Sequence, residues 1–334
     1  MNALNVVTLF LFNIVVYNIP LLYGTVGEII TEKSGSLNLG VEGIMAVGAM
    51  FGYLAGNLSN SMLLGMLVSI VSAGLCGLLF AVLTVSFQAN QNVTGLTITT
   101  FGLGLYFFVG KGMGGNWPAM QASSSLTAGW TAVEIPGLSA IPVVGKALFS
   151  HNVLVYLAIV IAVAAWWYLK YTKTGLKLRA VGENPGAADS VGVNITLYKY
   201  VHLILGAAIM GLGGFYMALC MGGSFEGSNC WINGYGWIAV ALVIFANWNK
   251  VYAILGTLVF GFFNTLQVYA GSLASAFPNG LGWLSAVPSH LFKALPFIIT
   301  AIVLVVSSIR KKQGSGQPAA LGANTFREVR LTVM

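Results

Sequence analysis

Long apolar runs alternate with short polar segments along the whole chain. A transmembrane helix needs about 20 apolar residues, or somewhat fewer when it is enclosed in a bundle. The run at 236–248 is the shortest, and so short a helix is tolerated in a membrane only where protein surrounds it. The pattern predicts an all-α, polytopic membrane helix bundle with broken or re-entrant helices and about nine spans, at roughly residues 5–26, 38–56, 62–86, 92–110, 153–169, 197–220, 236–248, 251–270 and 291–308.

The composition agrees with this pattern. Hydrophobic residues make up 57% of the chain, charged residues make up 7%, and the mean hydropathy is +0.85. A water-soluble domain needs more polar surface than this composition provides. We therefore expect membrane lipid to surround the chain. Residues 1–312 are expected to form a single transmembrane domain. Residues 313–334, rich in Gly, Ser, Ala and Pro, are expected to form a disordered cytoplasmic tail.

The basic residues predict the orientation of the bundle. With the N-terminus outside and the C-terminus in the cytoplasm, all of the 15 lysines and arginines except Lys111, Lys146 and Lys293 are cytoplasmic, as the positive-inside tendency requires. The polar segment 170–199 then faces the cytoplasm. Residues 111–152 form a large external loop, at which a binding protein could dock. The net charge of +7 is spread over several loops, so nucleic acid is not an expected partner.

The segment 170–199 contains the signals of a short helix. Asn184 can cap free backbone N–H groups, Pro185 suits the first helical position, and Gly192 suits the end. This helix would place Ala187, Ala188 and Val191 on one small apolar face. It is too short to be stable alone in water, so it must pack on its own bundle or on another protein. A solvated loop that merely follows the topology rules is the alternative interpretation.

Four segments carry a resemblance to a known family. Residues 175–193, with the pattern G-x-x-x-R-A-V-G-E-N-P-x-A-A-x-x-x-G-V, resemble the cytoplasmic coupling loop of ABC importer permeases of the branched-chain amino acid, ribose and nucleoside group. EKSGSLNLGVEGIMAVG at 32–48, NVTGLTITTFGLGL at 92–105 and GWIAVALVIFANWN at 236–249 resemble segments found in the same order in these permeases. The first of the three is most similar to the nucleoside branch.

The resemblance implies a permease subunit of an ATP-driven importer for nucleosides in a bacterial cytoplasmic membrane, with simple sugars and riboflavin as the nearest alternatives. The implied partners are a second permease subunit, related or identical, a cytoplasmic ABC ATPase and an extracytoplasmic substrate-binding lipoprotein. No G-x-x-x-x-G-K-[ST] occurs, so ATP is expected to bind to the partner; no cofactor, metal or enzymatic activity is expected of this chain. The residues expected to couple to the ATPase are Arg179, Gly182, Glu183, Asn184, Pro185, Ala187, Ala188, Asp189 and Gly192.

Polar residues at the entries to apolar runs are candidates for the transport path, because such groups inside a membrane usually face a partner or a water-filled passage. The candidates are Asn38, Glu42, Asn92, Thr94, Thr97, Thr100 and Asn247. Helix capping is the alternative for Asn38 and Glu42. Hydrogen bonding of each threonine to a carbonyl of its own helix is the alternative for the threonines.

A short internal similarity favours two halves of opposite orientation. GIMAV at 43–47 aligns with GWIAV at 236–240, and the two copies would cross the membrane in opposite directions. An inverted repeat of this kind places a transport path near the interface of its halves, close to the membrane midplane.

An ion-coupled secondary transporter is the rival from another class. Such a protein would carry Asp, Arg or His within its central spans. His202 is the nearest candidate in this sequence.

Overall fold

The computed structural model describes residues 3–111, 120–121, 126, 131–139, 141–219, 224–225, 230–248, 250–309 and 316–325. Each of the nine predicted apolar runs coincides with a helix, and the prediction of an all-helical membrane bundle is confirmed. These helices are α1 (Ala3–Glu32), α2 (Val41–Ser59), α3 (Met62–Ala81) with the π-helical turn η1 (Val82–Ser86), α4 (Gln91–Gly110), α8 (Val153–Tyr171), α11 (Ile195–Met217), α12 (Tyr235–Phe245), α13 (Lys250–Ala276) and α15 (Ser289–Ile309). In the described residues, seven helices are long and apolar enough to cross a membrane, and α12 and part of α15 are shorter apolar helices.

The remaining elements lie in the connections. They are the helices α7 (Val144–Phe149), α9 (Lys173–Glu183), α10 (Pro185–Ser190), α14 (Pro278–Leu281) and η3 (Gly282–Ala286), and two small antiparallel pairs, β1 (Met120–Gln121) with β4 (Ser224–Phe225) and β2 (Val133–Glu134) with β3 (Ser150–His151). The proposed external loop 111–152 is described only in part, so most of its predicted structure lies outside the described residues.

The centre of the bundle is the crossing of α2 and α11. A Cβ atom on Gly48 would lie 2.5 Å from the Cα atom of Gly211, and one on Gly214 would lie 2.0 Å from the carbonyl oxygen of Met45. Helices in lipid gain stability from close packing and not from burial of apolar surface, so small residues at crossings matter. Gly48, Gly52 and Gly56 recur at four-residue spacing along α2, and their function here is close packing.

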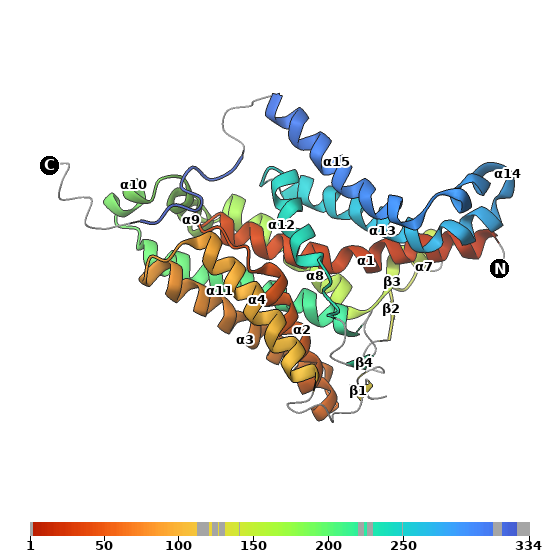
Figure 1. Cartoon of the computed structure of the whole chain (residues 1–334), viewed down its shortest axis with the longest axis horizontal. Helices are drawn as coiled ribbons and strands as arrows, with labels where there is room; N and C mark the ends of the chain where they lie inside the picture. The colour runs from red at the N-terminus through yellow and green to blue at the C-terminus, as the bar shows by residue number, and fades with distance from the viewer. Residues whose placement is uncertain are drawn as a thin grey trace.

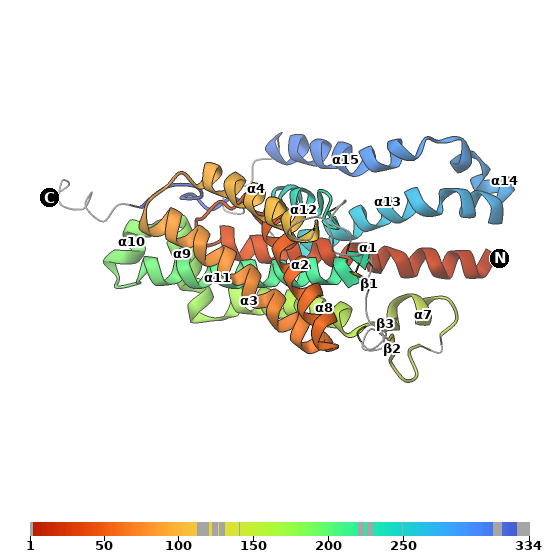
Figure 2. The same cartoon turned by 60° about the horizontal axis from the view of Figure 1, so that its bottom comes forward.

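Two groups of polar connections lie at opposite ends of the molecule, and the β1–β4 pair lies between them at the lower edge of Figure 1. In Figure 1, α9 and α10 lie at one end, and the start of α1 and α14 lie at the other. Four segments meet at the first end, which we call the α9–α10 end: residues 32–37, 87–91, 172–194 and 316–325. The backbone N–H of Leu37 donates to Gln91 Oε1 at 2.7 Å. A Cβ atom on Gly182 would lie 2.4 Å from the carbonyl oxygen of Lys33. α1, α13 and α15 extend side by side toward the opposite end (Figures 1 and 2).

α12 is the short helix that the sequence predicts. Its 11 residues span about 16 Å, roughly half of the hydrocarbon core of a bilayer. It packs against α1, α2 and α13, so protein encloses much of it. α2 and α12, the two helices that carry the internal similarity, begin side by side, because Gly234 and Gly236 at the start of α12 contact Glu42 in the first turn of α2.

The tail differs from the sequence expectation. Residues 316–325 form turns on the α9–α10 end, where Ala320 N–H donates to the Gly182 carbonyl at 3.0 Å and Gly322 N–H donates to the Gly35 carbonyl at 3.1 Å. The prediction of disorder is wrong for these ten residues, and the remainder of 313–334 lies outside the described residues. Composition fails here because this segment is held through backbone hydrogen bonds, which do not depend on apolar side chains.

Candidate coupling surface and transport path

The polar segment forms a hairpin of α9 and α10, of which α10 begins as its capping signals predict. The side chain of Thr172 accepts a hydrogen bond from Gly175 N–H at 2.9 Å and starts α9. Asn184 ends α9, and its side chain accepts from Ala187 N–H at 2.9 Å to start α10, with Pro185 at the first helical position. Gly192 follows with a φ of +82°, which a residue with a side chain rarely adopts.

The apolar face predicted for α10 is divided in the structure. Ala188 is 2% exposed and packs with Val181 and Val193 inside the hairpin. Ala187 is exposed, and Val191, directly after α10, is 78% exposed. Ala188 therefore stabilises the hairpin itself, whereas Ala187 and Val191 are available to a partner protein.

The charged candidates surround the first turn of the tail. Arg179 and Glu183 are exposed on α9, and Glu183 Oε2 accepts a hydrogen bond from Ala319 N–H at 3.2 Å. Lys33 lies close to both. Burial lowers the pKa of Lys33, Glu183 opposes that shift, and the like charge of Arg179 adds to it. Asp189 is partly buried in α10. Gly182 is buried where α9 meets the segment after α1.

Glu42 connects the two helices that begin inside the bundle. Its carboxylate is 4% exposed and accepts from Gly234 N–H and Gly236 N–H, each at 2.7 Å. The side chain therefore caps α12, not its own helix. Asn38, which is 2% exposed, accepts from Gly40 N–H at 2.8 Å and fixes the turn that leads into α2. Glu42 thus caps α12, whereas Asn38 bonds within the turn before α2 and caps no helix.

The threonine hydroxyls of α4 donate either to carbonyls one turn earlier or to a carbonyl outside the helix. The hydroxyls of Thr94, Thr97 and Thr100 donate to carbonyls one turn earlier in α4, at 2.8, 2.8 and 3.0 Å. Thr94 is buried, whereas Asn92, Thr97 and Thr100 lie on the outer face of α4. Thr99, which was not among the candidates, donates across to the Leu39 carbonyl at 2.9 Å. It is Thr99 that links α4 to the α2–α12 junction.

Asn247 lies apart from the other path candidates. It follows the last turn of α12, and its Oδ1 atom lies next to Gly316 of the tail at the α9–α10 end. The structure thus brings Asn38 and Glu42 together and places α4 beside them, but it leaves Asn247 a full length of α12 away.

Some buried polar residues were missed by sequence reasoning. Glu28 and Glu32, one turn apart near the end of α1, are 0% and 1% exposed, and the Trp248 indole N–H donates to Glu32. Two carboxylates at i and i+4 directly after an apolar run were the available signal.

His202 bonds to the Tyr168 hydroxyl at 2.8 Å and to the Tyr198 carbonyl at 2.6 Å, so it joins α8 to α11.

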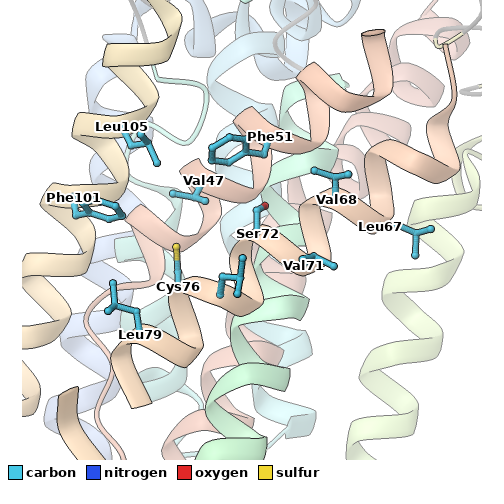
Figure 3. A pocket seen from close by; sticks show the side chains of 11 residues that line it. Val47, Phe51, Leu67, Val68, Val71, Ser72, Cys76, Leu79, Phe101 and Leu105 are labelled. Atoms are coloured by element: carbon cyan, nitrogen blue, oxygen red, sulfur yellow. The ribbon is translucent and has the colours of Figure 1, made fainter. Parts of the chain in front are cut away.

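An apolar groove lies on one side of the bundle. It has a volume of 560 Å³ and lies among α2, α3 and α4 (Figure 3). Ser72 is the only polar residue that lines it, and its hydroxyl donates to the Ser69 carbonyl at 3.2 Å. A wall of Val, Leu and Phe side chains offers nothing to a polar solute, so this groove is not a candidate for the transport path.

Comparison with known proteins decides the family. A model of the family described as branched-chain amino acid transport system / permease component matches residues 10–304. The chain belongs to this permease family. It is a multi-pass ABC transporter permease, which is a transport component and not an enzyme. No solved structure matches it.

Individual relatives are similar over most of their length. The nucleoside ABC transporter permease protein NupC of Lactococcus lactis is 34% identical over 92% of this chain and 94% of its own. The guanosine ABC transporter permease protein NupQ of Bacillus subtilis is 32% identical over 86% of this chain and 88% of its own. The glucose ABC transporter permease protein TsgB13 of Haloferax volcanii is 28% identical over 92% of this chain and 78% of its own.

Proposed function

We propose that this chain is the membrane-spanning permease subunit of an ATP-driven importer of nucleosides. The observation that carries the proposal is the similarity, along nearly the whole chain, to a permease named for nucleosides. A second relative is named for guanosine, which belongs to the same chemical class. In the proposed importer, this subunit forms the path together with a second permease subunit, identical or related. An extracytoplasmic binding protein delivers the solute.

The α9–α10 hairpin is the proposed contact with the cytoplasmic ATPase. The support is its geometry: a rigid, capped hairpin at one end of the bundle, with Val191 and Ala187 exposed on its surface. Apolar side chains that project from a polar end of a membrane protein fit a partner's groove better than they fit water. The proposed orientation therefore has the α9–α10 end in the cytoplasm and the N-terminus outside.

The α2–α12 junction is the proposed moving part of the path. Broken helices that meet inside a membrane bundle commonly border the solute pathway of transporters. Here Glu42 joins the start of α12 to α2, and the Trp248 indole joins its other end to Glu32 of α1. In alternating access, displacement of the hairpin by the ATPase would change the relative positions of α1, α2 and α12 and so open or close the path.

A simple sugar is the second candidate substrate, because two relatives from Haloferax volcanii are named for glucose, TsgB13 and the putative glucose permease TsgC13, which is 33% identical to this chain. Uptake competition separates the two. Cells that depend on this importer should accumulate a radiolabelled nucleoside, and excess unlabelled nucleoside should abolish that uptake whereas excess glucose or riboflavin should not. Competition by glucose alone would overturn the nucleoside assignment.

A further inference from the structure

A second cavity, of 440 Å³, lies among α1, α12, α13 and α15, next to the start of α12. Figures 1 and 2 show α1, α13 and α15 extending toward the N-terminal end, with α12 near the middle of the molecule, where it packs against all three. Cavities that bind small molecules usually have volumes of about 300 to 1,000 Å³. The cavity therefore has room for a small solute, and the chemistry of its walls decides which one.

Amide side chains line one wall of this cavity. Asn264 and Gln267 are one turn apart near the middle of α13, and Asn233 lies just before α12. Asn264 Nδ2 donates to the Tyr235 hydroxyl at 3.0 Å, which fixes that amide and leaves its oxygen free. The side-chain amides of Asn233 and Gln267 have no hydrogen-bond partner among the described residues. Free amides are costly against lipid tails, so this wall must face water or a polar solute.

Aromatic side chains line the rest of the cavity. Tyr17 comes from α1, Tyr235 and Trp237 from α12, and Phe297 from α15. Trp237 is 41% exposed and Phe297 is 50% exposed, so their faces are available to a ligand. Aromatic side chains stack on nucleic-acid bases whatever the base, because every base has a planar π-face.

The cavity offers no charge to a ligand. None of the described residues that line it is acidic or basic. The backbone N–H groups at the start of α12, which would otherwise attract an anion, already donate to Glu42. A zwitterionic amino acid or a nucleotide would leave its charges unpaired here, and a buried unpaired charge is strongly unfavourable. The walls favour a neutral, planar solute with a hydrogen-bonding edge.

We propose that this cavity binds the base of the transported nucleoside, with Gln267 and Asn264 at the edge of the base and Trp237 against its face. The assignment rests on the proposed function and names the part of the path in which the solute is held. Because Gly234 and Tyr235 line the cavity and adjoin the Glu42 cap, a shift of α2 against α12 would reshape the site. Binding and opening of the path are thereby connected.

Photolabelling of the assembled importer tests the site directly. The probe is the azido derivative of a nucleoside that the cells take up, 8-azidoadenosine for a purine or 5-azidouridine for a pyrimidine. The label is expected on peptides that contain residues 233–238 or 264–268, and excess unlabelled nucleoside should prevent it. Label confined to other parts of the chain, or to partner subunits, would overturn the site while nucleoside uptake, and with it the proposed function, remained.

Uptake kinetics of three variants provide the matched measurement. Gln267→Leu keeps the size of the side chain but loses the amide, so the nucleoside concentration for half-maximal uptake should rise about tenfold. Trp237→Ala should have a similar effect, and Trp237→Phe should restore most of the affinity. Ser72→Ala, in the apolar groove, is the control and should leave the value unchanged. If all variants, at equal membrane levels, had the same nucleoside concentration for half-maximal uptake, the assignment of the cavity would be overturned. If the cells took up no nucleoside, the proposed function would be overturned with it.

Discussion

Glu42 illustrates how one buried carboxylate can organise a broken helix. The first N–H groups of α12 have no carbonyl partner within their own helix. A carboxylate is a strong acceptor for such groups and also interacts favourably with the positive end of the helix dipole. Since Glu42 belongs to α2, this single side chain satisfies α12 and ties it to α2 at the same time.

We predict that Glu42→Ala destabilises the protein in detergent and lowers its melting temperature. The change would leave two buried N–H donors unpaired, and each such donor costs about 1–3 kcal/mol. Glu42→Gln is the control: its amide retains one acceptor oxygen, so the loss should be smaller. Equal melting temperatures for the parent protein and the alanine variant would contradict the capping role.

Thr97 and Thr99 show that the sequence does not reveal which hydroxyl of a helix bonds to another segment of the chain. They are two positions apart, yet Thr97 bonds to its own helix and Thr99 bonds to Leu39. A threonine in a helix can always reach a carbonyl one turn earlier, so the sequence identifies a cluster of hydroxyls but not the one that faces another element. That choice depends on the placement of α4 against the segment before α2.

At the scale of elements, α10 was predicted well because its signals are local, whereas α9 was not predicted. Asn184, Pro185 and Gly192 lie within nine residues and act through the backbone next to them. The buried side of α10 was not predictable, because it depends on Val181 and Val193 in neighbouring segments. The contact between Glu42 and Gly236 joins residues 194 positions apart, and no local pattern specifies it.

The hairpin makes a prediction that separates folding from coupling. Val191→Glu should reduce copurification of the ATPase and slow uptake while the melting temperature stays unchanged, because Val191 is 78% exposed. Ala188→Glu should instead lower the melting temperature, since Ala188 is 2% exposed and an unpaired charge would be buried there. Normal ATPase copurification with Val191→Glu would argue that the hairpin is only a solvated connection.

The tail makes a second prediction at this scale. Truncation after Lys312 should increase amide hydrogen exchange in residues 33–37 and 88–91, because the tail bonds to Gly35 and because Asn324 Nδ2 donates to the Gln88 carbonyl at 2.6 Å. Truncation after Thr325 keeps those contacts and is the matched control. Unchanged exchange in the shorter variant would mean that the tail does not stabilise this end of the bundle.

The whole molecule has two polar ends, and the proposed orientation assigns them to opposite sides of the membrane. After replacement of Cys76, Cys220 and Cys230, a cysteine at Ser190 should react with an impermeant thiol reagent only in opened cells. A cysteine at Ser285, exposed in η3 at the other end, should react in intact cells. Labelling of both in intact cells, or the reverse pattern, would contradict the orientation.

His202 bears on the rival mechanism at the same scale. It was the nearest candidate for ion coupling, but it is 2% exposed and bonded to Tyr168 and Tyr198. Such a residue fixes the packing of α8 on α11. Transport would therefore depend on an external source of energy, which the hairpin would transmit to the bundle.

The most direct test of this account is the energy source of transport. The chain, its ATPase and its second permease subunit would be reconstituted in proteoliposomes, with nucleoside-loaded binding protein outside and ATP inside, and uptake of the radiolabelled nucleoside would be measured. Uptake is expected to require ATP, to stimulate its hydrolysis and to persist when ionophores abolish the ion gradients. Uptake without ATP that collapses with an ion gradient would contradict this expectation.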